Sequence, residues 1–182
     1  TPIDCVEASR HNPATAYVAA NGYAHGDYSP HLYKTTNYGE TWNTIVTGIN
    51  NTDFVRVVRE DPERAGLLYA GTEGGPYVSW DSGSTWQSMQ GNLPRVPIHD
   101  LVVKNGDLIA ATHGRSIWIL DDLSPFHQIN DSIINSEIHL FKPRSAYRYL
   151  YQPYNYQPTP PVAPRDGKQK TYQLCLGSPT TY

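Results

Sequence analysis

Residues 79–86, Ser-Trp-Asp-Ser-Gly-Ser-Thr-Trp, are the stretch that decides the fold of this chain. The pattern is typical of two strand ends joined by a tight turn, because an Asp side chain can accept backbone N–H groups and Gly83 can adopt a positive φ. The chain resumes an extended run at Thr85 and Trp86, and a tryptophan there is large enough to anchor a core. A single hairpin would indicate little, but this one recurs.

The same pattern occurs in two further places. Residues 35–42, Thr-Thr-Asn-Tyr-Gly-Glu-Thr-Trp, repeat it 44 positions earlier with Asn in place of Asp. A weaker copy lies 40 positions later, within residues 117–126, and ends at Phe126. We expect both tryptophans to be buried between neighbouring hairpins. The predicted structural residues of the turns are Thr35, Asn37, Gly39, Thr41, Trp42, Ser79, Asp81, Gly83, Thr85, Trp86 and Asp121.

The repeat resembles the Asp-box, or BNR, repeat, Ser/Thr-x-Asp-x-Gly-x-Thr-Trp. Residues 61–87 and 107–123 resemble the C-terminal part of the propeller in large bacterial proteins described as BNR-repeat, sortilin-like or "glycosyl hydrolase" proteins. The resemblance covers roughly residues 4–148. It implies hairpins between the third and fourth strands of propeller blades, with their turns on the outer lower rim. The family name does not define one activity.

The spacing of the repeats predicts an all-β fold, a β-propeller fragment of about three four-stranded antiparallel blades. The predicted blades span about residues 1–50, 51–94 and 95–141. No long segment has apolar residues at helical spacing, and a β-sandwich would not repeat one turn at this interval. The first strands are expected at residues 5–9, 54–59 and 98–104, and the fourth at 42–46, 86–89 and 126–129. Residues 142–182, rich in Tyr and Pro, are expected to form an irregular arm or linker.

Composition limits the classes of partner. The 182-residue chain has a formal net charge of −3, so it offers no broad basic field and nucleic acid is not expected as a partner. No apolar run approaches the length of a membrane span. No Cys/His spacing predicts a metal site, and we expect no cofactor. Cys5 and Cys175 either form a disulfide or are two unrelated thiols.

Three blades are too few to close a propeller, which usually has four to eight. We therefore expect the remaining blades on the same longer chain or on another chain. The resemblance favours an extracellular, cell-surface or periplasmic location.

The candidate ligand-binding residues form two sets. Loops at the upper face, which enter the first strands and join the second strands to the third, are where binding groups tend to lie in this fold. The second set lies in the first strands, where an alignment places an acid, a base and an acid at one level, so that the base is expected between two carboxylates. The loop set is Glu73, His113, Arg115 and Arg95, with Asp53 nearby; the strand set is Glu7, Arg56 and Asp100.

Each set has a purely structural alternative, in which the charges solvate loops or form an ion-pair ring around the channel. The functional interpretation is a secreted or cell-surface binding or scaffold module for a saccharide or a polypeptide. The alternative is a glycoside hydrolase, sialidase-like or xyloglucanase-like, with catalytic groups partly in missing blades. No spacing selects a catalytic pair of carboxyl groups, so no catalytic residue is assigned.

Overall fold

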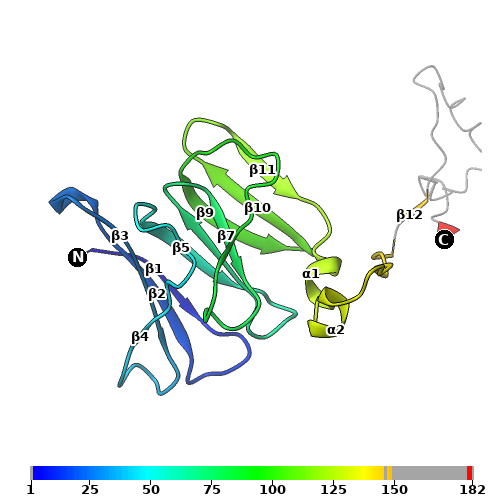
Figure 1. Ribbon diagram of the computed structural model, residues 1–182, viewed down its shortest axis with the longest axis horizontal. Coiled ribbons are helices and arrows are strands. Elements are labelled where there is room, and N and C mark those ends of the chain that lie inside the picture. The colour runs from blue at the N-terminus through cyan, green and yellow to red at the C-terminus, as the bar shows by residue number, and fades with distance from the viewer. Residues whose placement is uncertain (1, 146, 149–179, 182) are drawn as a thin grey trace, which may run out of the picture. The chain divides into compact units, whose positions relative to one another are not determined.

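The computed structural model of the protein describes residues 2–145, 147–148 and 180–181. Its larger part consists of three antiparallel sheets that follow one another along the chain, coloured from blue through teal to green in Figure 1. The first sheet comprises β1 (Ile3–Ala8), β2 (Ala16–Gly22), β3 (Asp27–Thr35) and β4 (Asn43–Thr44). The second comprises β5 (Val55–Glu60), β6 (Leu68–Thr72), β7 (Pro76–Ser79) and β8 (Gln87–Ser88). The third comprises β9 (Ile98–Lys104), β10 (Asp107–Thr112) and β11 (Ile117–Leu120).

Each sheet is an up-and-down meander, because strands that are consecutive in the chain pair with each other. The prediction of an all-β chain of successive antiparallel blades is confirmed. We call the three sheets blades 1, 2 and 3. The helices are short: η1 (Tyr23–His25), α1 (Ser124–Gln128) and α2 (Asp131–Ile134).

Blade 3 has three strands, and the prediction of a fourth strand at residues 126–129 is wrong. Those residues begin in α1, which follows β11 (Figure 1). Pro125 lies in the first turn of this helix, where its fixed φ suits a helix and its missing N–H costs nothing. The amide of His127 donates to the carbonyl of Leu123 at 3.1 Å, a bond of helical spacing. A proline at this point therefore turns the chain into a helix where blades 1 and 2 add a strand.

The turn that precedes α1 uses a different carboxylate from the one expected. The sequence placed Asp121 at the acidic position of the third turn. In the structure Asp122, one residue later, accepts hydrogen bonds from the backbone N–H of Ser124 at 3.1 Å and from its hydroxyl at 2.6 Å.

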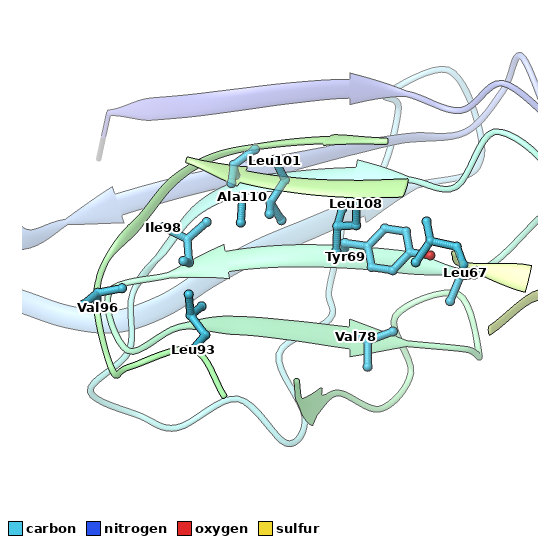
Figure 2. Close-up of a cluster of buried hydrophobic side chains, with 11 residues drawn as sticks. Leu67, Tyr69, Val78, Leu93, Val96, Ile98, Leu101, Leu108 and Ala110 are labelled. Carbon is cyan, nitrogen blue, oxygen red and sulfur yellow. The ribbon is translucent and has the colours of Figure 1, made fainter. Parts of the chain in front are cut away.

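Two apolar clusters join the blades. Between blades 1 and 2 the buried residues include Tyr17, Leu32, Ile49, Val55, Val58, Tyr77 and Trp86. Between blades 2 and 3, shown in Figure 2, they include Leu67, Tyr69, Val78, Leu93, Val96, Ile98, Leu101 and Leu108. Each cluster combines side chains from two adjacent sheets, so the blades are held together by face-to-face packing of apolar surface.

The turn at residues 79–86 is built on two side-chain oxygens. Ser79 Oγ accepts the N–H of Gly83 at 2.9 Å, and Asp81 Oδ1 accepts the N–H of Thr85 at 2.9 Å. Burial opposes ionisation of Asp81, but hydrogen bonds from Thr85 and Ser79 outweigh it and lower the pKa of Asp81. Gly83 has φ of +90°, which a side chain would strain.

The turn at residues 35–42 repeats this network. Thr35 Oγ1 accepts the N–H of Gly39 at 3.0 Å, and Asn37 Oδ1 accepts the N–H of Thr41 at 3.0 Å. The Asn amide oxygen replaces the Asp carboxylate oxygen without a change of geometry. The prediction that these side chains bond their own turns is confirmed for both.

The two tryptophans that follow these turns differ in burial. Trp86 is 3% exposed, and its indole N–H donates to the carbonyl of Ile45 in blade 1 at 2.8 Å. Trp42 is 43% exposed. The prediction that both are buried is therefore right for Trp86 and wrong for Trp42. Trp86 packs on the preceding blade, whereas Trp42 lies on the face of blade 1 that points away from blade 2.

The chain divides into two compact units, Thr1–Lys142 and Pro143–Tyr182. In the second unit the described residues form β12 (Tyr147–Arg148), paired antiparallel with β13 (Thr180–Thr181). The arm expected at residues 142–182 lies mostly outside the described residues, as does Cys175, while Cys5 is a free cysteine. None of the described helices has the length and hydrophobicity needed to cross a membrane.

Candidate functional site

The first strand of each blade contains a β-bulge near its N-terminal end. We call the side of the blades on which the first strands begin the upper face. Pairing with the second strand skips one residue between Ile3 and Cys5 in β1, and one between Val55 and Val57 in β5. In β9 it skips the residue after Ile98. A bulged residue has no partner in the ladder, and its side chain is aimed away from the regular alternation. The bulged residues are Asp4, Arg56 and His99, which therefore occupy equivalent places in the three blades.

The expected contact of Arg56 with Glu7 and Asp100 is wrong. It is Arg59 whose guanidinium lies between the two carboxylates: Nη2 is 2.8 Å from Asp100 Oδ1 and Nη1 is 3.4 Å from Glu7 Oε2. An acid–base–acid contact between three blades therefore exists, but with a different arginine at its centre.

The prediction of Arg56 in the place of Arg59 has a structural cause. The alignment matched the turn residues Asn12 and Asp61, but the structural equivalent of Asp61 is Ser9. Ser9 Oγ accepts the N–H groups two and three residues further on, as Asp61 Oδ1 does in blade 2. Strand pairing agrees, since Glu7 and Arg59 take the same place opposite the second strands of their blades.

The other contacts of Arg59 also join blade 2 to blades 1 and 3. Its Nε donates to the carbonyl of Leu101 at 2.9 Å, and Nη1 contacts the Cys5 sulfur at 2.9 Å. Burial alone would lower the pKa of Arg59, but the neighbouring Cys5, Asp100 and Glu7 outweigh it and raise the pKa. This guanidinium links all three blades by ion pairs and hydrogen bonds.

Arg56 instead belongs to the upper face. Its Nη2 and Nε donate to Glu73 Oε2 at 2.8 Å and 3.1 Å. The guanidinium carbon lies 4.8 Å from the ring centroid of Phe54 and 5.8 Å from that of Tyr23, within cation–π range. The structure thus brings together two predicted site residues, Arg56 and Glu73, beside two aromatic rings.

An aromatic platform, formed by Tyr23, Tyr28 and Phe54, adjoins this ion pair. The Tyr23 ring is stacked on Phe54 with centroids 5.4 Å apart and planes 14° apart, and Tyr28 lies 6.3 Å from Phe54. Phe54 is buried, whereas Tyr23 and Tyr28 are 50% and 55% exposed. Tyr23 begins η1, which ends at His25 and is capped by Gly26 with φ of +79°. Two tyrosine rings are therefore fixed on a buried phenylalanine and remain accessible.

Two histidines lie on the blade 3 side of the site. The rings of His99 and His113 are stacked with centroids 4.9 Å apart, and the N–H of His113 donates to the carbonyl of Pro97 at 2.9 Å. Burial and the nearby charges of Arg56 and His113 lower the pKa of His99. His99 is therefore predominantly neutral at pH 7 and can both donate and accept a hydrogen bond.

The other two predicted loop cations have different surroundings. Arg95 Nη2 pairs with Asp53 Oδ1 at 2.7 Å, and the phenol of Tyr77 donates to Asp53 Oδ2 at 3.2 Å. Asp53 is buried, so this contact fixes the loop that enters blade 3 to the loop that enters blade 2. Arg115 is exposed, and its carbonyl accepts the indole N–H of Trp118 at 2.8 Å.

Sequence reasoning missed Asp4, His99 and the aromatic platform. A signal for the first two was present: the first strands begin Ile-Asp-Cys-Val, Val-Arg-Val-Val and Ile-His-Asp-Leu, with a polar residue second in each. The platform had no such signal, because its rings come from η1 and the start of β3 in blade 1 and from the residue before β5 in blade 2. Among the described residues no group of three or more His, Cys, Asp or Glu side chains could hold a metal ion.

No protein-family model and no curated protein matches the chain. Among solved structures it is similar to an ancestral GH74 enzyme, with a TM-score of 0.51 and 23% identity over 62% of this chain. It is also similar to the GH74 enzyme of Niastella koreensis, with a TM-score of 0.52 and 16% identity over 66% of this chain. The fold is that of a β-propeller. The chain spans 14% and 21% of the length of these two proteins, and at such identities the likeness concerns the fold alone.

Proposed function

We propose that these blades are part of a propeller that binds a saccharide on its upper face. The observation that carries the proposal is the aromatic platform with the Arg56–Glu73 ion pair at its side. A pyranose ring has an apolar C–H face that packs on an aromatic ring, and a rim of hydroxyls that require hydrogen-bond partners. Tyr23 and Tyr28 offer the ring surface, and the 38% exposed side chain of Glu73 offers acceptor oxygens.

Binding fits these contacts better than hydrolysis, the alternative. A glycoside hydrolase needs two carboxyl groups on opposite sides of the scissile bond. On the described upper face, Glu73 is neutralised by Arg56, Asp53 is buried beneath Arg95, and Asp4 accepts a hydrogen bond from the Asn21 amide. The proposal includes an extracellular, cell-surface or periplasmic location.

The test is a glycan panel applied to the full chain, with binding measured by titration calorimetry. Tyr23→Ala removes one ring of the platform and should weaken binding about tenfold, or about 1.4 kcal/mol. The matched control is Tyr38→Asn, an exposed tyrosine in the turn at residues 35–42, which should leave affinity unchanged. Release of reducing ends would instead establish the hydrolase alternative, and binding of peptides without glycans would overturn the saccharide assignment.

A further inference from the structure

A pocket lies between blades 2 and 3 at the place that an indole ring occupies between blades 1 and 2. Trp86 contributes that indole, which is buried and donates its N–H to the carbonyl of Ile45 at 2.8 Å. In blade 3 the repeat ends at Phe126 instead. Because Phe126 belongs to α1 and not to a fourth strand, its ring stacks on Trp80, with centroids 5.8 Å apart.

We call this space the interblade pocket, and it has a volume of about 240 Å³. One wall is formed by the start of β7 and the segment that leaves β8, and the other by β10, β11 and α1. Three of its apolar residues, Leu93, Leu108 and Ala110, are labelled in Figure 2. The residues that line it include Met89, Leu93, Leu108, Ala110, Trp118 and Phe126.

The wall from blade 2 repeats the surroundings of Trp86. Met89 is the equivalent of Ile45, because each donates its N–H at 2.9 Å to a carbonyl on the third strand of its own blade. Met89 donates to Pro76, and Ile45 donates to Leu32. The Met89 carbonyl therefore corresponds to the carbonyl that accepts the indole N–H at the first junction.

The wall from blade 3 shows the same correspondence. Strand pairing places Ala110 opposite Trp118 in blade 3, as it places Ala70 opposite Tyr77 in blade 2. Ala70 and Tyr77 belong to the apolar cluster that contains Trp86, whereas Ala110 and Trp118 line the interblade pocket. Blades 2 and 3 therefore form both walls of an indole site, while α1 replaces the strand that carries the indole in blade 2.

We infer that the interblade pocket binds a small aromatic molecule of the indole class, a planar bicyclic ring with one ring N–H. An apolar cavity of about 150 Å³ in another protein stays dry and takes up benzene, so a larger apolar pocket can accept a bicyclic ring. The N–H of the ligand donates to the Met89 carbonyl, as Trp86 donates to Ile45.

The interblade pocket can be reached from solvent, because Ile119 and Leu120 line it and are 57% and 39% exposed. The inference does not depend on the saccharide proposal. Among the described residues, those that line this pocket include neither the aromatic platform nor the Arg56–Glu73 ion pair.

The test uses the full chain, with indole itself as the probe. Met89 is the only methionine in the sequence, so labelling with [methyl-13C]methionine gives one NMR signal from the wall of the pocket. The ring current of bound indole should shift this signal in a saturable way, and the titration gives Kd. Indene has nearly the same shape without the N–H, so it should bind about fivefold more weakly through loss of one hydrogen bond.

Two substitutions locate the site. Ala110→Leu adds a larger side chain inside the interblade pocket and should abolish the saturable shift. Its matched control is Ala111→Leu, the same change one residue further along β10, where the side chain points to the opposite face of the sheet and the affinity should stay unchanged. Leu120→Phe narrows the pocket from an exposed position and gives a second test if Ala110→Leu does not fold.

Three results would overturn the inference: no shift of the Met89 signal, a shift that survives both pocket substitutions, or equal affinity for indole and indene. A peptide with the sequence of residues 84–89, Ser-Thr-Trp-Gln-Ser-Met, distinguishes a further case. A shift with this peptide and none with indole would show that the pocket takes a strand, and would overturn the assignment of a small molecule as well.

Discussion

Trp86→Ala tests whether the junction of blades 1 and 2 depends on one buried aromatic side chain. Truncation of a buried Trp costs about 3–5 kcal/mol through lost transfer energy and the cavity that remains. The substitution also leaves the partly buried carbonyl of Ile45 without its indole donor, which adds about 1 kcal/mol. We therefore expect the free energy of unfolding to fall by about 4–6 kcal/mol, a large part of the stability of a domain of this size.

Trp42→Ala is the matched control, because the same residue type follows the same turn in blade 1. Trp42 is 43% exposed, so roughly half of its transfer energy is absent and no closed cavity forms at an open face. Its truncation should cost about 2 kcal/mol. A third variant, Trp86→Phe, keeps most of the packing and removes the N–H donor, so it should lie between the two.

The assay is urea unfolding of the full chain followed by far-UV circular dichroism, since tryptophan fluorescence changes with the substitutions themselves. Each loss of stability moves the urea midpoint to lower concentration, by an amount set by the slope of the transition. Equal losses for Trp86→Ala and Trp42→Ala, within about 1 kcal/mol, would refute the reasoning that interblade burial sets the cost.

Three further predictions concern charged and turn residues. Burial opposes ionisation of Asp61, but hydrogen bonds from His127 and two backbone N–H groups outweigh it and lower the pKa of Asp61. Ionised Asp61 therefore stabilises the fold at pH values above its unfolded pKa of about 4. This stability is lost as the pH falls through the lower pKa of the folded state. Asp61→Asn should flatten the acid unfolding curve below about pH 4, and an unchanged curve would contradict this. Arg59→Met should lower the urea midpoint because two carboxylates lose their guanidinium partner, whereas the exposed Arg10→Met should not; equal midpoints would argue against a structural role for Arg59. Asp81→Asn should change the free energy of unfolding by less than about 1 kcal/mol, since Asn37 accepts the equivalent backbone N–H in its own turn and bonds the equivalent threonine hydroxyl as a donor; a larger loss would show that the charge matters.

The strands could be predicted from the sequence because the repeated turn fixes the third and fourth strands on either side of it. The oxygen acceptors at Asn37 and Asp81 act within their own turns, so their role follows from local sequence. The missing fourth strand of blade 3 depends on Pro125, whose fit to a helical first turn outweighed the repeat. The exposure of Trp42 could not be read from its turn, since burial there depends on a neighbouring blade.

The site was predicted in part. Arg56 and Glu73 were both selected, but their pairing with each other follows from the bulge in β5, which depends on backbone pairing between strands. The alignment matched Asn12 with Asp61, although Ser9 has the turn role of Asp61 in blade 1. This error in spacing led to the prediction of Arg56, instead of Arg59, between the two carboxylates. Contacts between rings from separate loops, such as Tyr23 on Phe54, require the three-dimensional fold.

The three bulges separate two tasks that a regular strand would combine. A residue inside the ladder must suit its hydrogen-bonded neighbours and the apolar cluster beneath it, and a substitution there disturbs both. Asp4, Arg56 and His99 lie outside that constraint, at one place in each blade. The side chain at this place therefore differs from blade to blade, acid, base and imidazole, while the strand pairing stays the same. Substitutions at these three places can therefore change the polar surface without removing a hydrogen bond of the ladder.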